Sequence, residues 1–388
     1  MKPRGAALPG KDWSRVSRGT FCGLSKGVAP HVRKDARHLL CCPLISVTLR
    51  ISRPFWICGT FSPFKIDVPG VNMNRRAFTQ TVAGAIVGAA GLNHGPLFGA
   101  RSRSEGDKSE DSGVPFKFSV MLWTVFKDLP FEQRLEKVAE AGYRNVELVG
   151  EYDKWTEEDF SRANAKRKEL GLSFDCSAGL KHGVSNPADR ESLLAELREA
   201  LTIMERIDCP SMILLSGNRI PGMAREAQHQ SCIDTLKAGA AMVEGKTIHG
   251  ERVRLLLETI DPEENPKYYL TSIAEALEIV EAVNHPQVQL LYDFFHEQIA
   301  NGNLIAKLEK SIPHLGLVHI ADVPGRHEPG TGEINYQNVF RKLAELNYRG
   351  VAAMEFLPSG DPVTQLRAAR EMALQAAREG MSKKASSA

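Results

Sequence analysis

The stretch VRLLLE, residues 253–258, is a short apolar run that ends on an acid. Three more runs of the same form follow it along the chain: VQLLYD (288–293), LGLVHI (315–320) and VAAME (351–355). A segment with helical periodicity separates each run from the next, which is typical of parallel strands joined by crossover helices. Each run carries a polar residue at or near its end, and these are spaced 35, 26 and 36 residues apart: Glu258, Asp293, His319 and Glu355.

These four terminal side chains form a pattern suited to a divalent cation. If successive parallel strands end at one face of a barrel, their last side chains converge. Carboxylate oxygens with one imidazole suit Mn²⁺ or Mg²⁺, with Co²⁺ as a further option, better than an ion that prefers thiolates. Any one acid alone is better explained as a polar strand end near water, but four in register favour a cation. We expect no organic cofactor.

The preceding part of the chain shows the same alternation of strand-like and helix-like segments. Four further apolar runs are separated by helical patterns, and the second carries Glu147: FKFSVML (116–122), YRNVELV (143–149), LSFDCSA (172–178) and SMILLSG (211–217). Eight strands and eight helices in alternation predict a (β/α)8 TIM barrel of the α/β class. We place the barrel at residues 115–378 and expect residues 379–388 to form a tail.

The opening segment differs from the rest in charge. Residues 1–72 hold twelve Lys and Arg against three Asp, a net charge of +9, so the remainder carries −7. We interpret residues 1–72 as a disordered or non-native extension, with no motif that would indicate nucleic-acid binding. Four of the seven cysteines lie there, and the other three are scattered without CxxC pairing, so no disulfide or zinc framework is predicted.

A second start is indicated at Met73, where MNRRAFTQTVAGAIVGAAGL (73–92) begins. The paired arginines and the following Ala- and Gly-rich stretch resemble a bacterial twin-arginine export signal, which we place at residues 73–100. The apolar stretch is shorter than the ~20 residues of a membrane-spanning helix, so no membrane anchor is predicted. With Met73 as the true start, the protein is expected to be exported to the periplasm; the alternative is a cytoplasmic protein. Residues 101–114 form a polar linker.

Four motifs resemble the hydroxypyruvate isomerase family, which lies within the xylose isomerase-like TIM barrels together with the ketose 3-epimerases. They are LLLETID (255–261), YDFFH (292–296), HIADVPGRHEPGTGEINY (319–336) and AMEF (353–356). The resemblance covers about residues 116–377 and implies one divalent cation held by the four terminal residues. It also implies a role in carbohydrate metabolism and is compatible with a homo-oligomer. One departure is His319, where bacterial hydroxypyruvate isomerases have Gln and the epimerases have His.

The resemblance implies that Glu258 and Glu355 face opposite sides of a small-molecule α-hydroxycarbonyl substrate. Moving a carbonyl between adjacent carbons requires removal of a proton beside the C=O, and a cation stabilises the resulting enediolate. One glutamate takes the proton and the other returns it. We expect interconversion of hydroxypyruvate and tartronate semialdehyde; a metal-assisted hydride shift is the competing mechanism.

Other functions were weighed on the same site. The first alternative is a ketose 3-epimerase or another sugar or inositol isomerase, epimerase or dehydratase. A phosphodiester hydrolase is more remote, because it needs a multi-zinc cluster and extra histidines at the earlier strand ends. A non-catalytic sugar-binding barrel is the third class, and the presence of both Glu258 and Glu355 argues against it.

Three residues near the cation ligands are predicted to contact substrate. His296 and Glu264 match substrate-contacting positions in the epimerase relatives. A structural role is the alternative for His296, and the loop ETIDPEEN (258–265) around Glu264 departs from that of the relatives. Arg326 is the candidate for gripping a substrate carboxylate, because a guanidinium binds a carboxylate through two parallel hydrogen bonds. Its alternative role is a salt bridge that braces the loop.

Three residues after earlier strands complete the predicted substrate site. Lys181 and His182 follow the third strand, and their alternative is an ordinary solvated loop. Trp123 follows the first strand and is predicted to form an apolar wall, with barrel-top packing as the alternative.

Overall fold

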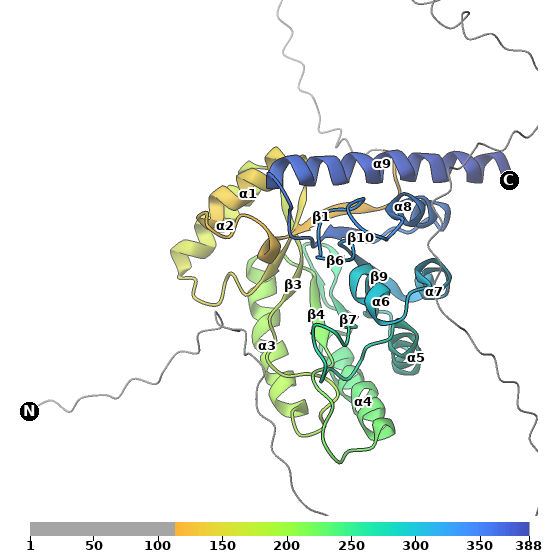
Figure 1. Ribbon diagram of the computed structural model, residues 1–388. Coiled ribbons are helices and arrows are strands. Elements are labelled where there is room, and N and C mark those ends of the chain that lie inside the picture. Colours follow the sequence, from red (N-terminus) through yellow and green to blue (C-terminus); the bar gives the residue numbers. More distant parts are fainter. Residues whose placement is uncertain (1–112, 388) are drawn as a thin grey trace, which may run out of the picture. The chain divides into compact units, whose positions relative to one another are not determined.

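The computed structural model describes residues 113–387, which form a closed barrel of eight parallel strands surrounded by helices (Figure 1). The order around the barrel is β1, β10, β9, β8, β7, β4, β3 and β2, with β2 paired to β1. The (β/α)8 prediction is therefore confirmed. The strands are β1 (Lys117–Met121), β2 (Asn145–Val149), β3 (Ser173–Ala178), β4 (Ser211–Leu215), β7 (Arg254–Glu258), β8 (Val288–Asp293), β9 (Leu315–Ile320) and β10 (Val351–Met354).

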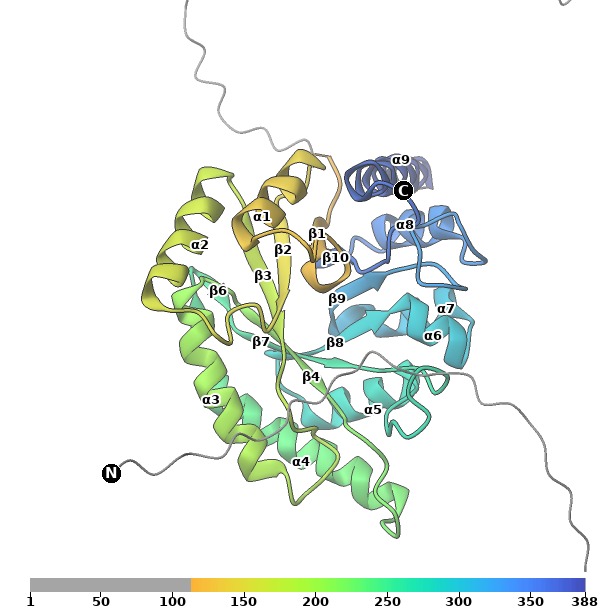
Figure 2. The ribbon, with the colours of Figure 1, turned by 60° about the vertical axis from the view of Figure 1, so that its left-hand side comes forward.

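One long helix follows most strands and packs its apolar side on the barrel (Figure 2). In the last strand-connecting helix, Val339, Phe340 and Leu343 are buried at helical spacing while Asn335 caps the first turn through its side chain. The main helices are α1 (Phe131–Glu140), α2 (Glu157–Glu169), α3 (Arg190–Arg206), α4 (Arg225–Val243), α5 (Ile273–Val283), α7 (Leu304–Ser311), α8 (Tyr336–Glu345) and α9 (Pro362–Ser387).

Several short elements were not anticipated from the sequence. Helix α6 (Phe294–Ala300) begins directly after β8, because the Asp293 side chain accepts hydrogen bonds from the first backbone N–H groups of the turn. A hairpin of β5 (Thr247–Ile248) and β6 (Glu251–Arg252) precedes β7. Two 3₁₀ turns complete the described elements: η1 (Leu122–Thr124) and η2 (Ile312–His314).

The C-terminal segment also differs from expectation. Residues 379–387, which we expected to form a tail, continue helix α9 past α8 (Figure 1). The segment contains no proline. Its one glycine, Gly380, lies where α9 meets α8, and a Cβ atom at this position would lie 2.4 Å from the Arg341 carbonyl oxygen. The close approach of the two helices therefore explains a glycine within α9, at a position that helix propensity alone would not favour.

The barrel interior is an apolar layer with polar residues above and below it. Its buried members come from every strand but β2: Met121, Cys176, Ile213, Leu256, Leu291, Leu317, Val351 and Ala353. A larger cluster of buried residues lies between the strands and the helices. Side chains that alternate along a strand thus face either the helices or the barrel axis, and the last axial positions line the mouth.

The interpretations of residues 1–72 and 73–100, and most of the linker 101–114, lie outside the described residues. Among the described residues, no helix combines the length and the apolar character needed to cross a membrane.

Candidate active site

Four consecutive strands around the barrel, β7 to β10, bring together the four polar side chains that lie at or just past the C-terminal ends of these strands. Each of the four offers one ligand atom, and these atoms all lie within 4.8 Å of one another. All four side chains are buried at the C-terminal mouth of the barrel. The members of this acid cluster are Glu258, Asp293, His319 and Glu355.

The donor set of the acid cluster fits a divalent cation. Nδ1 of His319 lies 2.8 Å from Glu355 Oε2 and 3.4 Å from Glu258 Oε1. This buried nitrogen nevertheless makes no hydrogen bond within the described part of the chain. A buried polar atom that lacks a partner usually has a specific explanation, and here it faces carboxylate oxygens that suit Mn²⁺, Mg²⁺ or Co²⁺.

The environments of the two glutamates differ. Burial raises the pKa of Glu258, although His319 opposes the shift. Burial also acts to raise the pKa of Glu355, but His319 and Arg326 outweigh it and hold that pKa well below its usual range. His319 and Arg326 thus keep Glu355 ionised in a site that water hardly reaches.

Two residues bind Glu355 from opposite sides. Nε1 of Trp123 donates to Glu355 Oε1 at 2.7 Å, and Nη2 of Arg326 donates to Glu355 Oε2 at 2.7 Å. Arg326 Nη2 also lies 3.4 Å from Asp293 Oδ2, and its guanidinium lies 5.5 Å from the centre of the Trp123 ring. The structure therefore brings both residues to the acid cluster, and Trp123 supplies a hydrogen-bond donor as well as the expected apolar surface.

His296 belongs to a second polar group beside the acid cluster. Its Nδ1 lies 2.6 Å from Asp261 Oδ2, and its Nε2 lies 3.4 Å from Asp293 Oδ2 and 3.3 Å from Arg326 Nη1. Glu264 is exposed and lies at the edge, 3.5 Å from the same Arg326 nitrogen. Burial alone would lower the pKa of His296, but Asp293 and Asp261 raise it to about 9.

Two buried acids in these groups, Asp261 and Glu147, were not predicted from the sequence to take part in the site. Asp261, three residues past Glu258, anchors His296 and also accepts hydrogen bonds from two backbone N–H groups of its own loop. Glu147 on β2 lies 2.9 Å from Nε2 of His319. Strand alternation could have placed Glu147 on the barrel axis, but nothing in its spacing connected it with His319.

Lys181 and His182 are held by a different residue. The backbone N–H groups of both donate to Glu196 Oε2, at 2.9 and 3.2 Å, and the His182 ring lies 2.8 Å from Glu196 Oε1. Within residues 113–387, no hydrogen bond or ion pair joins them to the acid cluster. The contacts brace the loop against α3, and the predicted role of Lys181 and His182 in substrate binding stays a prediction.

The other half of the mouth is apolar. Val149 and Ala178, the last residues of β2 and β3, pack against the interior layer, as does Trp123 just after β1. Leu215 is the last residue of β4 and lies in register with Glu258. It is 37% exposed, which is unusual for a leucine in this barrel. The strand ends at the mouth are therefore polar on β7 to β10 and form an apolar half on β2 to β4.

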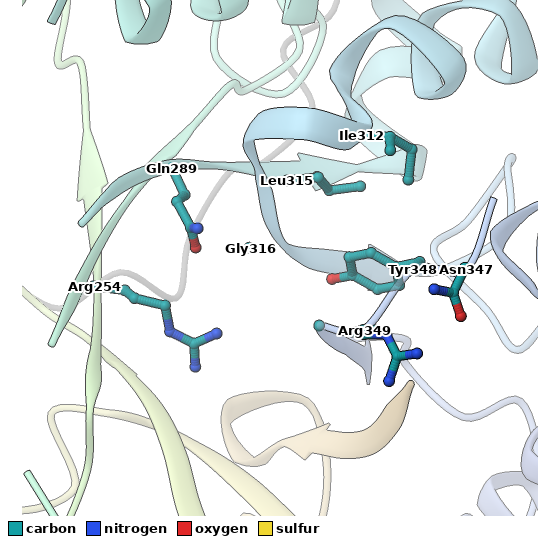
Figure 3. A pocket seen from close by; sticks show the side chains of 9 residues that line it. Arg254, Gln289, Ile312, Leu315, Gly316, Asn347, Tyr348 and Arg349 are labelled. Atoms are coloured by element: carbon teal, nitrogen blue, oxygen red, sulfur yellow. The ribbon is translucent and has the colours of Figure 1, made fainter. Parts of the chain in front are cut away.

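A cavity of about 320 Å³ lies at the opposite end of the barrel (Figure 3). Arg254 and Gln289 face it from one side, and Tyr348 and Arg349 from the other. Arg254 is the first residue of β7 and Glu258 the last, so the apolar interior layer separates this cavity from the acid cluster. The N-terminal face of such barrels ordinarily serves stability, whereas the chemistry lies at the C-terminal face.

Comparison with known proteins places the chain among enzymes of related sequence. A family model described as xylose isomerase-like TIM barrel matches residues 135–377. The chain is 33% identical to 2-oxo-tetronate isomerase of Pectobacterium atrosepticum over 252 residues, which cover 63% of this chain and 93% of that protein. It is 32% identical to the putative hydroxypyruvate isomerase of Danio rerio over 262 residues, or 64% of this chain and 92% of that protein.

Solved structures show the same architecture. An AP endonuclease, family 2, from Brucella melitensis is 28% identical with a TM-score of 0.59, covering 66% of this chain and 98% of that chain. An L-ribulose 3-epimerase is 18% identical with a TM-score of 0.58, covering 70% of this chain and 98% of that chain, a likeness that shows the fold alone.

Proposed function

Because the chain belongs to the xylose isomerase-like TIM barrel family, we propose that it is a divalent-cation-dependent isomerase of a small α-hydroxycarbonyl acid. The substrate pair that fits best is hydroxypyruvate and tartronate semialdehyde, with intramolecular oxidation of one carbon and reduction of its neighbour. The observation that carries this proposal is the acid cluster, in which Glu258 and Glu355 approach the same imidazole nitrogen from two strands.

The acid cluster supplies both the cation ligands and the proton-transfer groups. Glu258, Asp293, His319 and Glu355 would hold the cation, which when bound polarises the substrate oxygens and stabilises the enediolate. One glutamate removes the proton from C3 of hydroxypyruvate, and the electron pair moves into the C2–C3 bond. The other glutamate delivers a proton to C2 while the hydroxyl proton on O3 passes to O2, which leaves the carbonyl at C3 and a hydroxyl at C2.

Arg326 supports an acid as the substrate. Its buried guanidinium lies between the acid cluster and His296, and a planar cation at this depth pairs with a carboxylate through directed hydrogen bonds. His296, held by Asp261, would hydrogen-bond a substrate oxygen. A neutral ketose offers Arg326 no negative charge.

The apolar half of the mouth supports a short substrate. Val149, Ala178 and Leu215 provide no donor or acceptor on their side chains, so hydroxyl groups of a long sugar would lose hydrogen bonds to water there without replacement. A three-carbon acid leaves this half free. A four-carbon acid is the second candidate, because a relative with 33% identity is named 2-oxo-tetronate isomerase.

The test is turnover of a substrate panel by the full chain with added Mn²⁺, Mg²⁺ or Co²⁺ and with chelator. We expect activity on hydroxypyruvate or 2-oxo-tetronate that depends on the cation, and solvent deuterium in the product formed in D₂O. Product without deuterium would support a hydride shift instead of the two glutamates. Inactivity on both acids together with activity on ketohexoses would move the assignment to the epimerases.

A further inference from the structure

We propose that Glu147 is a positioning residue that orients the imidazole of His319 so that Nδ1 faces the acid cluster. The inference rests on the proposed function, because it assigns His319 to a cation site. It adds a residue from β2, a strand that carries none of the four residues of the acid cluster.

The contact between the two side chains fixes which ring nitrogen is free. His319 Nε2 lies 2.9 Å from Glu147 Oε2, and the two side chains are 1% and 0% exposed. A cation held by Nδ1 requires the hydrogen of the neutral ring to be on Nε2, and Glu147 Oε2 is placed to accept it there. In the neutral imidazole the lone pair is then on Nδ1, the nitrogen that points toward Glu258 and Glu355.

Packing does not explain a carboxylate at position 147. Glu147 is in register with Met121 on one side and Cys176 on the other, and both belong to the apolar interior layer. The second oxygen of Glu147, Oε1, has no hydrogen-bond partner within the described residues. A buried acid in such a layer is costly, and an apolar residue of similar volume is often neutral or stabilising at such a position.

The barrel also offers a matched comparison. Asp175 on β3 is a second buried acid of the interior, and its Oδ1 accepts a hydrogen bond from Ser119 Oγ at 2.8 Å. Asp175 makes no hydrogen bond to any member of the acid cluster within residues 113–387. Substitution of Asp175 therefore tests the effect of altering a nearby buried acid, whereas substitution of Glu147 also removes the contact to His319.

The experiment measures Mn²⁺ and Co²⁺ affinity by calorimetry on the full chain, with melting temperatures in chelator. We expect Glu147→Met to weaken binding by about 10- to 100-fold, the usual effect of losing the acceptor behind a metal-binding histidine. Its melting temperature in chelator should be unchanged or higher. Glu147→Gln keeps a neutral acceptor and should weaken binding about fivefold. The visible spectrum of bound Co²⁺ should change in Glu147→Met, and Asp175→Asn should bind as the wild type does.

Each result has one meaning. Wild-type affinity in Glu147→Met overturns the positioning role, as does equal weakening in Asp175→Asn, which would indicate a general effect of altering a buried acid of the interior. If Glu147→Met fails to fold, Glu147→Gln decides, and wild-type affinity in that variant overturns the proposal. A wild-type chain that binds neither Mn²⁺ nor Co²⁺ would instead refute the cation site and with it the proposed function.

Discussion

Substitution of Trp123 by Phe tests whether the geometry around Glu355 governs activity. The change removes one hydrogen bond, from Nε1 to Glu355 Oε1 at 2.7 Å, and keeps an aromatic ring beside the Arg326 guanidinium. A hydrogen bond to a charged group contributes about 1.5–3 kcal/mol. Glu355 is buried and keeps its second bond, from Arg326, so the loss should not be made up by water. We therefore expect kcat/KM to fall by about 10- to 100-fold.

The assay is the isomerisation of hydroxypyruvate at saturating Mn²⁺, with kcat and KM determined separately. The matched control is Trp155→Phe. Trp155 packs in an aromatic group with Phe131, at 4.7 Å between ring centres, and its indole makes no hydrogen bond within the described residues. The control should keep kcat/KM within about twofold. Wild-type activity in Trp123→Phe, or an equal loss in Trp155→Phe, would refute the assignment of this hydrogen bond.

Four further outcomes follow from the same geometry. Glu258→Gln and Glu355→Gln should each lower kcat by about 10²- to 10⁴-fold in the hydroxypyruvate assay, and a fully active variant would exclude that glutamate from proton transfer. Arg326→Gln should reduce kcat/KM for acid substrates by about 10- to 100-fold, from the loss of a charged hydrogen bond; an unchanged value would show that Arg326 does not bind the carboxylate. Mn²⁺ at about 100 times its Kd should raise the free energy of unfolding by about 2.7 kcal/mol in denaturant titrations, and no rise would contradict binding to the folded chain. Burial raises the pKa of the Asp175 carboxyl to about 8. Above the ordinary pKa of aspartate the unfolded chain has released this proton while the folded protein keeps it, so the free energy of unfolding falls as the pH rises toward 8. Asp175→Asn should therefore gain stability relative to wild type between pH 5 and pH 8, by an amount on the order of a few kcal/mol, and parallel curves would contradict this.

The pattern of the sequence determined the barrel and one half of its mouth. Apolar runs at the spacing of one strand and one helix predicted the order of the strands, because periodicity is local and is set by backbone geometry. The same spacing placed Glu258, Asp293, His319 and Glu355 at successive strand ends, which the closed barrel brings within 4.8 Å.

Tertiary structure alone decided which distant side chains support them. His319 contacts Glu147 across 172 positions of sequence, and Trp123 contacts Glu355 across 232. Such pairs depend on closure of the barrel between β1 and β10 and on the register of β2, which no local pattern records. The sequence by itself thus indicated the residues at the ends of the strands, whereas the fold determined the hydrogen bonds that orient them, because those bonds join strands that are far apart in the sequence and the local pattern runs along one strand at a time.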